Sequence, residues 1–226
     1  MDNCATSKLR FETPTNLALE VAFDGGKLTS DGGLTWLANI DEELGLCESM
    51  AQHVPEWRKK KGKVNHSLLS LIRQRVFQIA CGYEDQNDAN TLRADPLLKL
   101  VCGSLPETGL DLASQPTISR FENAADARAC YRMAEALFEL YLGQRGEGGP
   151  PKKVLLDFDA TADPTHGEQE GSYYHGYYEQ HMYHPLLVFD GESGHLITAI
   201  LRAGNTHASR SAVAVLKRIV ARLRQK

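Results

Sequence analysis

The sequence changes character at residues 143–153, where Gly and Pro dominate and no periodic spacing of apolar residues survives. Before this stretch apolar residues recur with the spacing of helices, and after it they follow the shorter period of strands. The 226 residues are enough for one large domain or two small ones. We therefore predict a mixed α/β (α+β) chain, with a mostly helical domain over residues 1–145, a Gly/Pro linker over 146–153 and a sheet-containing domain over 154–226.

The N-terminal part predicts one short strand and several helices. The strand covers residues 17–23, and a helix follows Ser30 or Asp31 with an apolar stripe that Asp41 interrupts. A stronger helix runs over 67–81 and stops at Gly82. Further helices are expected at 88–92, 96–101, 117–122 and 126–142.

The C-terminal part predicts three strands and a helix. The strands cover 154–159, 182–189 and 195–202, and a hairpin turn at 190–194 joins the last two. We expect the third strand to lie beside the first. After residues 204–206 comes a helix with one apolar face, and its other face is basic.

The first of these strands carries two carboxylates. Side chains alternate along a strand, so Asp157 and Asp159 share one face, and Thr161 follows at the same spacing. Oxygen ligands suit Mg²⁺, which proteins usually hold with one or two carboxylates plus phosphate oxygens. The strand therefore predicts metal-assisted phosphoryl chemistry, with Asp159 and Asp157 as catalytic and metal-binding residues.

The pattern around these carboxylates fits two enzyme classes. In haloacid-dehalogenase-like phosphatases Asp157 would be a nucleophile and Asp159 a general acid. In DDE transposases Asp159 would be the first metal ligand. The phosphatase interpretation needs a later pair of acids, and no Asp or Glu follows Glu192, so we keep it as the alternative. An acidic strand end that only caps the next turn is the structural alternative, with Asp163 before Pro164 as a turn residue.

Basic residues gather at the C-terminal end although the net charge is −4. Lys217 and Arg218 lie on the polar face of the last helix, and Arg202 and Asn205 precede that helix. These residues are candidates for DNA phosphate contacts, as is Arg120 on a short helix that resembles a DNA reader. A solvated helix face, a helix cap at Asn205 or Thr206, and a buried surface helix are the ordinary alternatives.

Tyr and His cluster over residues 171–185. The sequence does not favour a zinc site from His166, His175, His181 and His184, because His181 and His184 would lie on opposite strand faces. The tyrosines could stack on the bases of an unpaired DNA end. The simpler interpretation is that they pack the hairpin. The five scattered cysteines predict free thiols, and neither a signal peptide nor a membrane span is expected.

Together these segments resemble DDE transposases of bacterial insertion sequences, and more narrowly the insertion-sequence family numbered thirteen-eighty. The matching stretches are residues 28–34, 74–89, 92–96, 115–122, 154–167 and 201–207. The resemblance implies a helical N-terminal domain for DNA binding and dimerisation. It also implies the first half of a ribonuclease-H-like domain, comprising its first three strands and first helix.

The resemblance further implies Mg²⁺ or Mn²⁺ as cofactor and DNA as partner, both as terminal inverted repeats and as target. It implies a homodimer in a synaptic complex and a cytoplasmic, nucleoid-associated bacterial protein. The family's second Asp and its Glu have no counterpart in this sequence. We therefore expect a transposase portion that is truncated before the second catalytic Asp and is inactive alone, or a non-catalytic DNA-binding regulator. An open sheet edge predicts oligomers or poor solubility.

Overall fold

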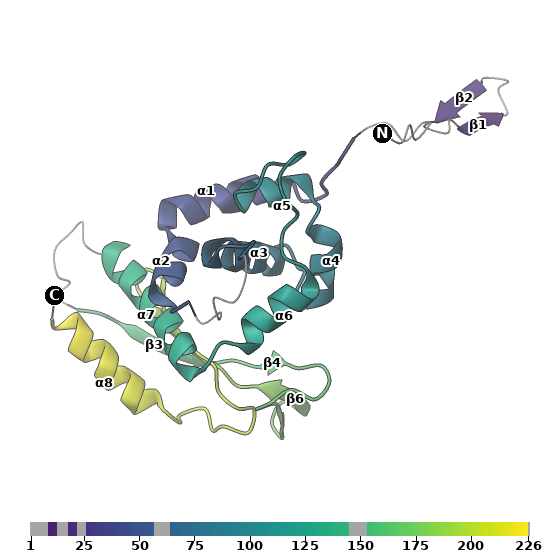
Figure 1. Ribbon diagram of the computed structural model, residues 1–226. Coiled ribbons are helices and arrows are strands. Elements are labelled where there is room, and N and C mark those ends of the chain that lie inside the picture. The colour runs from purple at the N-terminus through teal and green to yellow at the C-terminus, as the bar shows by residue number, and fades with distance from the viewer. Residues whose placement is uncertain (1–8, 13–17, 22–25, 57–63, 145–152, 226) are drawn as a thin grey trace. The chain divides into compact units, whose positions relative to one another are not determined.

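The computed structural model describes residues 9–12, 18–21, 26–56, 64–144 and 153–225 (Figure 1). The chain divides into two compact units, Met1–Ile40 with Lys60–Asn123 and Asp41–Lys59 with Ala124–Lys226. Helices occur together with small antiparallel sheets, which confirms the mixed α+β class. The predicted linker lies almost wholly outside the described residues, so a domain division there stays a prediction. No helix in the described ranges is long and apolar enough to cross a membrane.

The first unit is mainly helical. A buried cluster holds its helices together through Leu34, Phe77, Leu98 and Leu112. Its elements are β1 (Leu9–Glu12), β2 (Ala18–Val21), α1 (Leu34–Leu44, which runs on into the second unit), α3 (Leu68–Ala80), the short 3₁₀ helix η1 (Gln86–Asp88), α4 (Ala89–Leu92), α5 (Pro96–Val101) and α6 (Gln115–Asn123). The strands β1 and β2 pair antiparallel, and β1 was not predicted.

Side chains placed at helix starts explain why two of these helices begin where they do. The Ser67 hydroxyl accepts a hydrogen bond from the Ser70 N–H at 3.0 Å and caps α3. The Asp95 carboxylate accepts from the Leu98 N–H at 2.8 Å and caps α5, whose first residue is Pro96. Both caps satisfy backbone donors that have no partner within the helix.

Asp41, which interrupts the apolar stripe of α1, has a structural role. Its side chain is only 6% exposed. One carboxylate oxygen accepts a hydrogen bond from the Cys47 N–H at 2.8 Å, at the start of α2 (Leu46–His53). Gly45, with φ of 68°, makes the turn between α1 and α2. A buried polar residue in an apolar stripe therefore marks the end of one helix and supports the start of the next.

The second unit contains two three-stranded antiparallel sheets. The first has the order β3–β7–β8, and the second the order β4–β6–β5. The remaining elements of this unit are α2, α7 (Ala127–Gln144) and α8 (Ala212–Leu223). The strands are β3 (Leu156–Ala160), β4 (Asp163–Pro164), β5 (Tyr173–His175), β6 (Gln180–Tyr183), β7 (Leu186–Asp190) and β8 (Leu196–Ile200).

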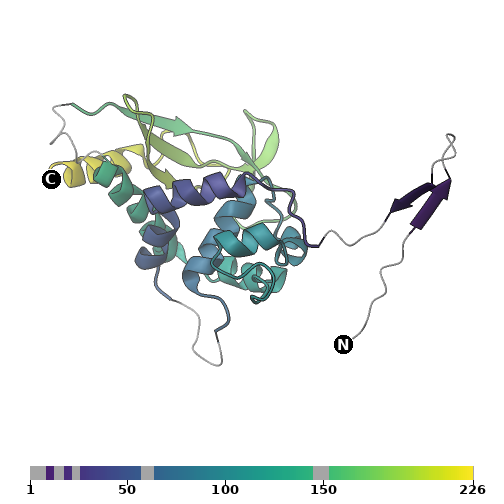
Figure 2. The same ribbon diagram turned by 90° about the horizontal axis from the view of Figure 1, so that it is seen from above.

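Helices α7 and α8 lie on the same side of the sheet β3–β7–β8, as Figure 2 shows. The core between them consists of Phe138, Tyr141, Leu142, Val188, Ile197 and Ile219, with Leu156 and Phe158 packed against it. Burial of these side chains holds the helices on the sheet, at about 1.5–3 kcal/mol for each fully buried large apolar residue. The other side of β3 is left to solvent.

Two expectations about the strands are wrong. The strand predicted over 182–189 is interrupted at His184 and Pro185, because proline has no N–H to donate to a ladder, and it forms β6 and β7 instead. The third strand, β8, does not lie beside the first, β3. Strand β7 lies between them: it pairs antiparallel with β3 on one side and, on the other, with β8, which follows it through a hairpin turn.

Candidate functional site

Strand β3 presents Asp157 and Asp159 on one exposed face. Leu156 and Phe158 alternate with them and pack on the core, so the strand is amphipathic with period two. Asp157 lies opposite Phe189 and Asp159 opposite Leu187 on β7. Among the described strands β3 has a neighbour on one side only, so its carboxylates stand at a sheet edge.

The row of carboxylates continues beyond β3. Ala160 pairs with Leu186, and three residues further along each strand Asp163 pairs with Tyr183. A hydrogen bond of 3.2 Å from the Thr161 N–H to the Pro185 carbonyl joins the two stretches. The register is therefore unbroken from one sheet to the other.

Alternation then places Asp163 on the same exposed face as Asp159. Its description as a turn residue is wrong, because Asp163 begins β4. Asp157, Asp159 and Asp163 form a row about 20 Å long, given a rise of about 3.3 Å per residue. We call these three residues the carboxylate row. The even spacing of the acids, two and then four residues, agrees with this placement.

The carboxylate row fits a divalent cation only in part. Neighbouring acids i and i+2 are separated by about 6.6 Å along the strand, and a Mg²⁺–oxygen bond is about 2.1 Å. Asp157 and Asp159 could therefore supply only the one or two carboxylates that Mg²⁺ commonly takes. In the parts of the chain that the structure describes, no three His, Cys, Asp or Glu side chains come together as a closed metal cluster. A bound ion would need further oxygen ligands from outside the row.

Arg202 does not reach solvent. It is 7% exposed, and its guanidinium donates to the carbonyls of His184 at 2.8 Å, Ala208 at 2.9 Å and Arg210 at 2.8 Å. Burial lowers the pKa of Arg202 below its ordinary value. These bonds tie the loop after β8 to the end of β6, so Arg202 positions a loop in this structure.

That loop is held against the second sheet at Gly204. A Cβ on Gly204 would lie 1.9 Å from the Met182 carbonyl oxygen, so only glycine fits. Its N–H donates to the Gly171 carbonyl at 3.0 Å. Asn205 is exposed beside it, while Thr206 is buried and its carbonyl contacts the His184 ring at 2.7 Å. Neither residue caps α8, whose N-cap is Ser211.

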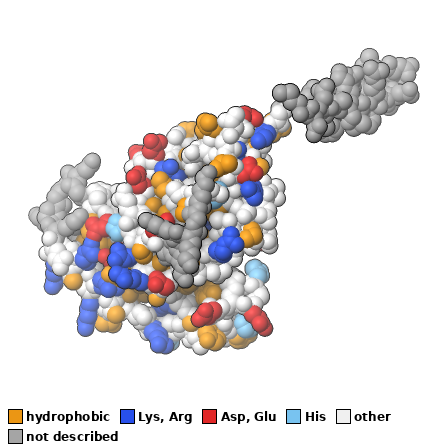
Figure 3. Space-filling view, viewed as in Figure 1, with side chains coloured by type: hydrophobic (Ala, Val, Ile, Leu, Met, Phe, Trp, Pro, Cys, Tyr) orange, Lys and Arg blue, Asp and Glu red, His pale blue; other side chains and the backbone are white. Residues whose placement is uncertain are grey.

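The basic residues of α8 differ in their surroundings. Lys217 is exposed. The guanidinium of Arg218 lies 4.3 Å from the centre of the Tyr131 ring on α7, a cation–π contact. Arg222 forms ion pairs with Glu135 and Glu139 of α7. Figure 3 shows Lys and Arg side chains gathered over α8 and the neighbouring part of α7.

Arg120 lies on α6, which confirms the helix predicted at 117–122 with slightly wider bounds. Ile118 and Phe121 are buried at 0% and 7%, so α6 packs through one face. Arg120 is on the exposed face, where one guanidinium nitrogen donates to the Thr117 hydroxyl at 3.3 Å. The Asn90 side chain accepts from the Gln115 N–H at 3.0 Å and fixes the start of the helix.

The Tyr and His residues line both sides of the β5–β6 hairpin. Tyr174 and His181 face each other across the strands, with ring centres 5.8 Å apart. His184 is buried, and its ring lies 4.8 Å from that of His175. Tyr177 is 84% exposed at the hairpin turn. His175 and His184 thus pack together, while Tyr173, Tyr174 and Tyr177 remain accessible.

A model of the family described as transposase DDE domain group 1 matches residues 11–226. Searches of curated proteins and of solved structures found no match.

Proposed function

The chain belongs to the DDE transposase family, and on that premise we propose that β3 supplies the first metal-binding carboxylates of a DNA strand-transfer site. Asp159, in the sequence Asp-Ala-Thr, is the proposed principal ligand, and Asp157 supports it from the same face. The observation that carries the proposal is the solvent-exposed carboxylate row on a strand whose opposite face is packed on α7 and α8.

The proposed chemistry is attack of water, or of a DNA 3′-hydroxyl, on a phosphodiester. Mg²⁺ or Mn²⁺ would stabilise the charge on the attacking and leaving oxygens, with two ions about 4 Å apart. The side chains of Asp159 and Asp157 would hold such an ion at the strand edge. Family membership favours this chemistry over the phosphatase alternative, in which Asp157 is the nucleophile.

We further propose that β3, β7, β8 and α8 correspond to the first elements of a ribonuclease-H-like domain of the insertion-sequence family thirteen-eighty type. The meander order β3–β7–β8 supports this, as does the packing of α8 on one side of the sheet. The free edge of β3 is where a further strand pairs in such a domain.

The 226-residue polypeptide is proposed to bind DNA without cleaving it. Among the described residues of β3 and β4, Asp157, Asp159 and Asp163 are the acids on the exposed face. A row of ligands from one strand cannot enclose two ions, because each ion needs about six oxygen ligands. Purified protein should therefore leave element-end DNA intact in Mg²⁺ or Mn²⁺. Cleavage that Asp159→Ala abolishes would contradict this part of the proposal.

The proposed partners are the terminal inverted repeats of the element and target DNA, bound by a homodimer at the nucleoid. Lys217 is the clearest phosphate contact, since it is exposed and no carboxylate lies against it within the described residues. Arg218, Arg120 and Asn205 are proposed as further contacts. Arg202 is assigned to the support of the loop that presents Asn205 and Arg210.

Two measurements test the proposal separately. Manganese binding, followed by the loss of the free Mn²⁺ electron paramagnetic resonance signal, should weaken with Asp159→Asn and should be unchanged with Glu192→Gln. Fluorescence anisotropy with an inverted-repeat duplex should show binding whose salt slope falls by about 1 in Lys217→Ala. Mn²⁺ affinity equal in wild type and Asp159→Asn would remove the metal assignment.

A further inference from the structure

A groove of about 730 Å³ lies between α7, α8 and the end of β8. Its volume is in the range of binding pockets, and its lining is mostly apolar. The walls come from Tyr131 and Phe138 of α7 and from Val215 and Ile219 of α8, and Ile200 of β8 forms the floor. The side chain of Cys130 also reaches the groove.

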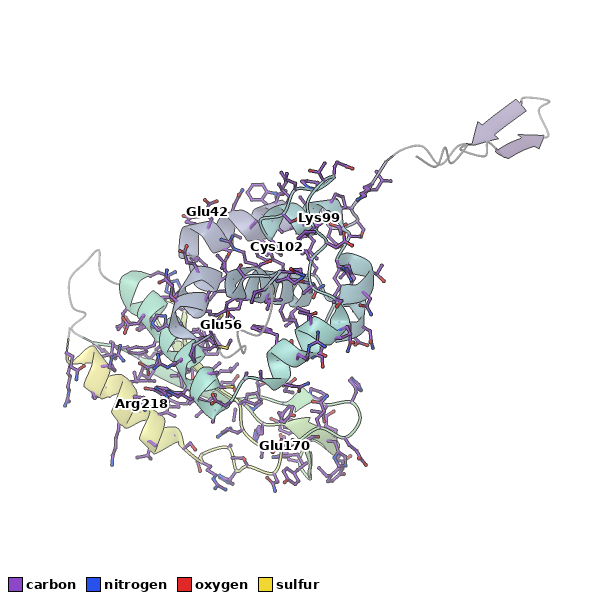
Figure 4. The ribbon with its side chains drawn as sticks, in the orientation of Figure 1. Glu42, Glu56, Lys99, Cys102, Glu170 and Arg218 are labelled. Atoms are coloured by element: carbon purple, nitrogen blue, oxygen red, sulfur yellow. The ribbon has the colours of Figure 1, made fainter. Side chains whose placement is uncertain are left out.

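The groove has a cation at its rim. Arg218, labelled in Figure 4, stacks on Tyr131 and has no carboxylate partner in the described residues. Arg222, one turn further along α8, is different, because Glu135 and Glu139 already neutralise it. The groove thus offers an apolar floor and one positive charge that remains to be paired.

Helix α1 has an apolar stripe that faces solvent. Trp36 is 74% exposed, Ile40 48% and Leu44 42%, and their spacing of four residues places them on one side of the helix. Glu43 is exposed on the same side. The opposite side is buried through Leu34 and Asp41. Soluble helices normally turn such a stripe toward a partner.

We propose that the stripe Trp36–Ile40–Leu44 of one copy of the chain docks in this groove of a second copy. Trp36 and Leu44 are eight positions apart, about 12 Å at 1.5 Å per residue, and Ala214 and Arg222 at the ends of the α8 wall are also eight positions apart. An amphipathic helix in an apolar groove, anchored at i, i+4 and i+8, is a common recognition mode.

Charge favours helix α1 of a second copy as the occupant of the groove over packing of the two grooves against each other. Two groove faces would bring Arg218 of one copy near basic residues of the other, which is repulsive. Helix α1 instead brings Glu43, which can pair with Arg218. Reciprocal docking buries two such contacts and closes as a two-fold dimer. This contact rests on the proposed function in one respect, because it would form the interface of the proposed homodimer. It does not depend on metal binding or DNA cleavage.

Sedimentation velocity of the full chain tests the contact first. We expect a concentration-dependent dimer, with a dissociation constant raised about tenfold or more in Ile40→Glu, because a charge replaces a buried apolar contact. Glu42→Gln is the control, since Glu42 lies off the stripe on the same helix (Figure 4). Arg218→Glu should also weaken the dimer, and adding Glu43→Arg should restore it.

Disulfide formation gives a second, geometric measurement. The thiol introduced by Trp36→Cys should cross-link to Cys130 of another copy under mild oxidation, as mass spectrometry of mixed tagged and untagged chains would show. The thiol introduced by Glu42→Cys should cross-link much more slowly. A monomer at all concentrations, equal cross-linking of both variants, or a cross-link within one chain would each overturn the proposal. DNA binding by a monomer would remove the homodimer from the proposed function and would leave its metal site and DNA contacts intact.

Discussion

At the scale of single residues, buried polar groups of the second unit hold strand ends and loops in place. Asp190 is fully buried at the end of β7, where it accepts from the Tyr141 hydroxyl at 2.9 Å and the Glu192 N–H at 3.1 Å. The sequence predicts a turn from Asp190 onward, whereas Asp190 is the last residue of β7. Alternation and period cannot show that a hydroxyl on α7 meets a carboxylate on β7.

Tyr141→Phe should destabilise the protein by about 1–3 kcal/mol, because it leaves a buried carboxylate oxygen without one of its donors. Urea unfolding followed by circular dichroism measures this. Tyr131→Phe is the matched control, since its hydroxyl bonds to Glu135 at the surface at 2.8 Å. Equal losses of unfolding free energy in the two variants would show that the Tyr141–Asp190 hydrogen bond contributes no more to stability than the surface bond.

Cys81 should react slowly with alkylating agents. Burial raises the pKa of the Cys81 thiol above its ordinary value of 9.0, and the negative charge of Asp31 raises it further. Because a raised pKa lowers the thiolate fraction at any given pH, the alkylation rate should reach half its plateau above pH 9.0. Asp31→Asn should lower the pH of this midpoint, and Glu107→Gln should leave it unchanged. Mass-resolved iodoacetamide labelling across pH measures both.

At the scale of elements, periodicity located most helices and three of the strands. The helices α3, α6, α7 and α8 and the strands β3 and β8 lie close to their predicted ranges. The short strands β4 and β5 were missed, because two or three residues cannot display a period of two. The break at Pro185 was also missed, although a proline inside an apparent strand is a signal that the sequence does contain.

The contact of the β8–α8 loop with the second sheet depends on one residue. Gly204→Ala should destabilise the protein by about 1–3 kcal/mol or more, because the new methyl group would overlap backbone atoms of Met182 and Tyr173. Gly176→Ala is the control, since nothing lies within 4 Å of its Cβ position. Thermal unfolding of the two variants tests the difference. A Gly204→Ala protein as stable as the Gly176→Ala protein would contradict the tight approach.

At the scale of the whole molecule, the second unit combines segments that are distant in sequence. Helix α7 precedes the Gly/Pro stretch but contributes Phe138, Tyr141 and Leu142 to the core beneath the sheet. The helical period predicts a helix over 126–142, but it cannot show which elements pack against that helix. The face shared by Asp157 and Asp159 was predictable from alternation, and Asp163 was not, because its place depends on a register that continues past the end of β3.

A polypeptide of residues 146–226 should therefore fail to fold, because it lacks the three core side chains of α7. Each lost large side chain removes about 1.5–3 kcal/mol of burial, which together approaches the whole stability of a small domain. A polypeptide of residues 124–226 retains them and should keep more structure. Amide proton NMR spectra of the two should differ in dispersion. Well-dispersed signals from residues 146–226 would show that the sheet and α8 suffice.

The unbroken register between the two sheets also constrains how the sequence can vary in length. One residue inserted between Ala160 and Asp163 would turn every later side chain of that strand to the opposite face, whereas two would restore the original facing. Insertions of even length are thus compatible with the carboxylate row and those of odd length are not. The continuous pairing from β3 to β4 therefore requires these acids to lie an even number of positions apart, but it does not require one particular number.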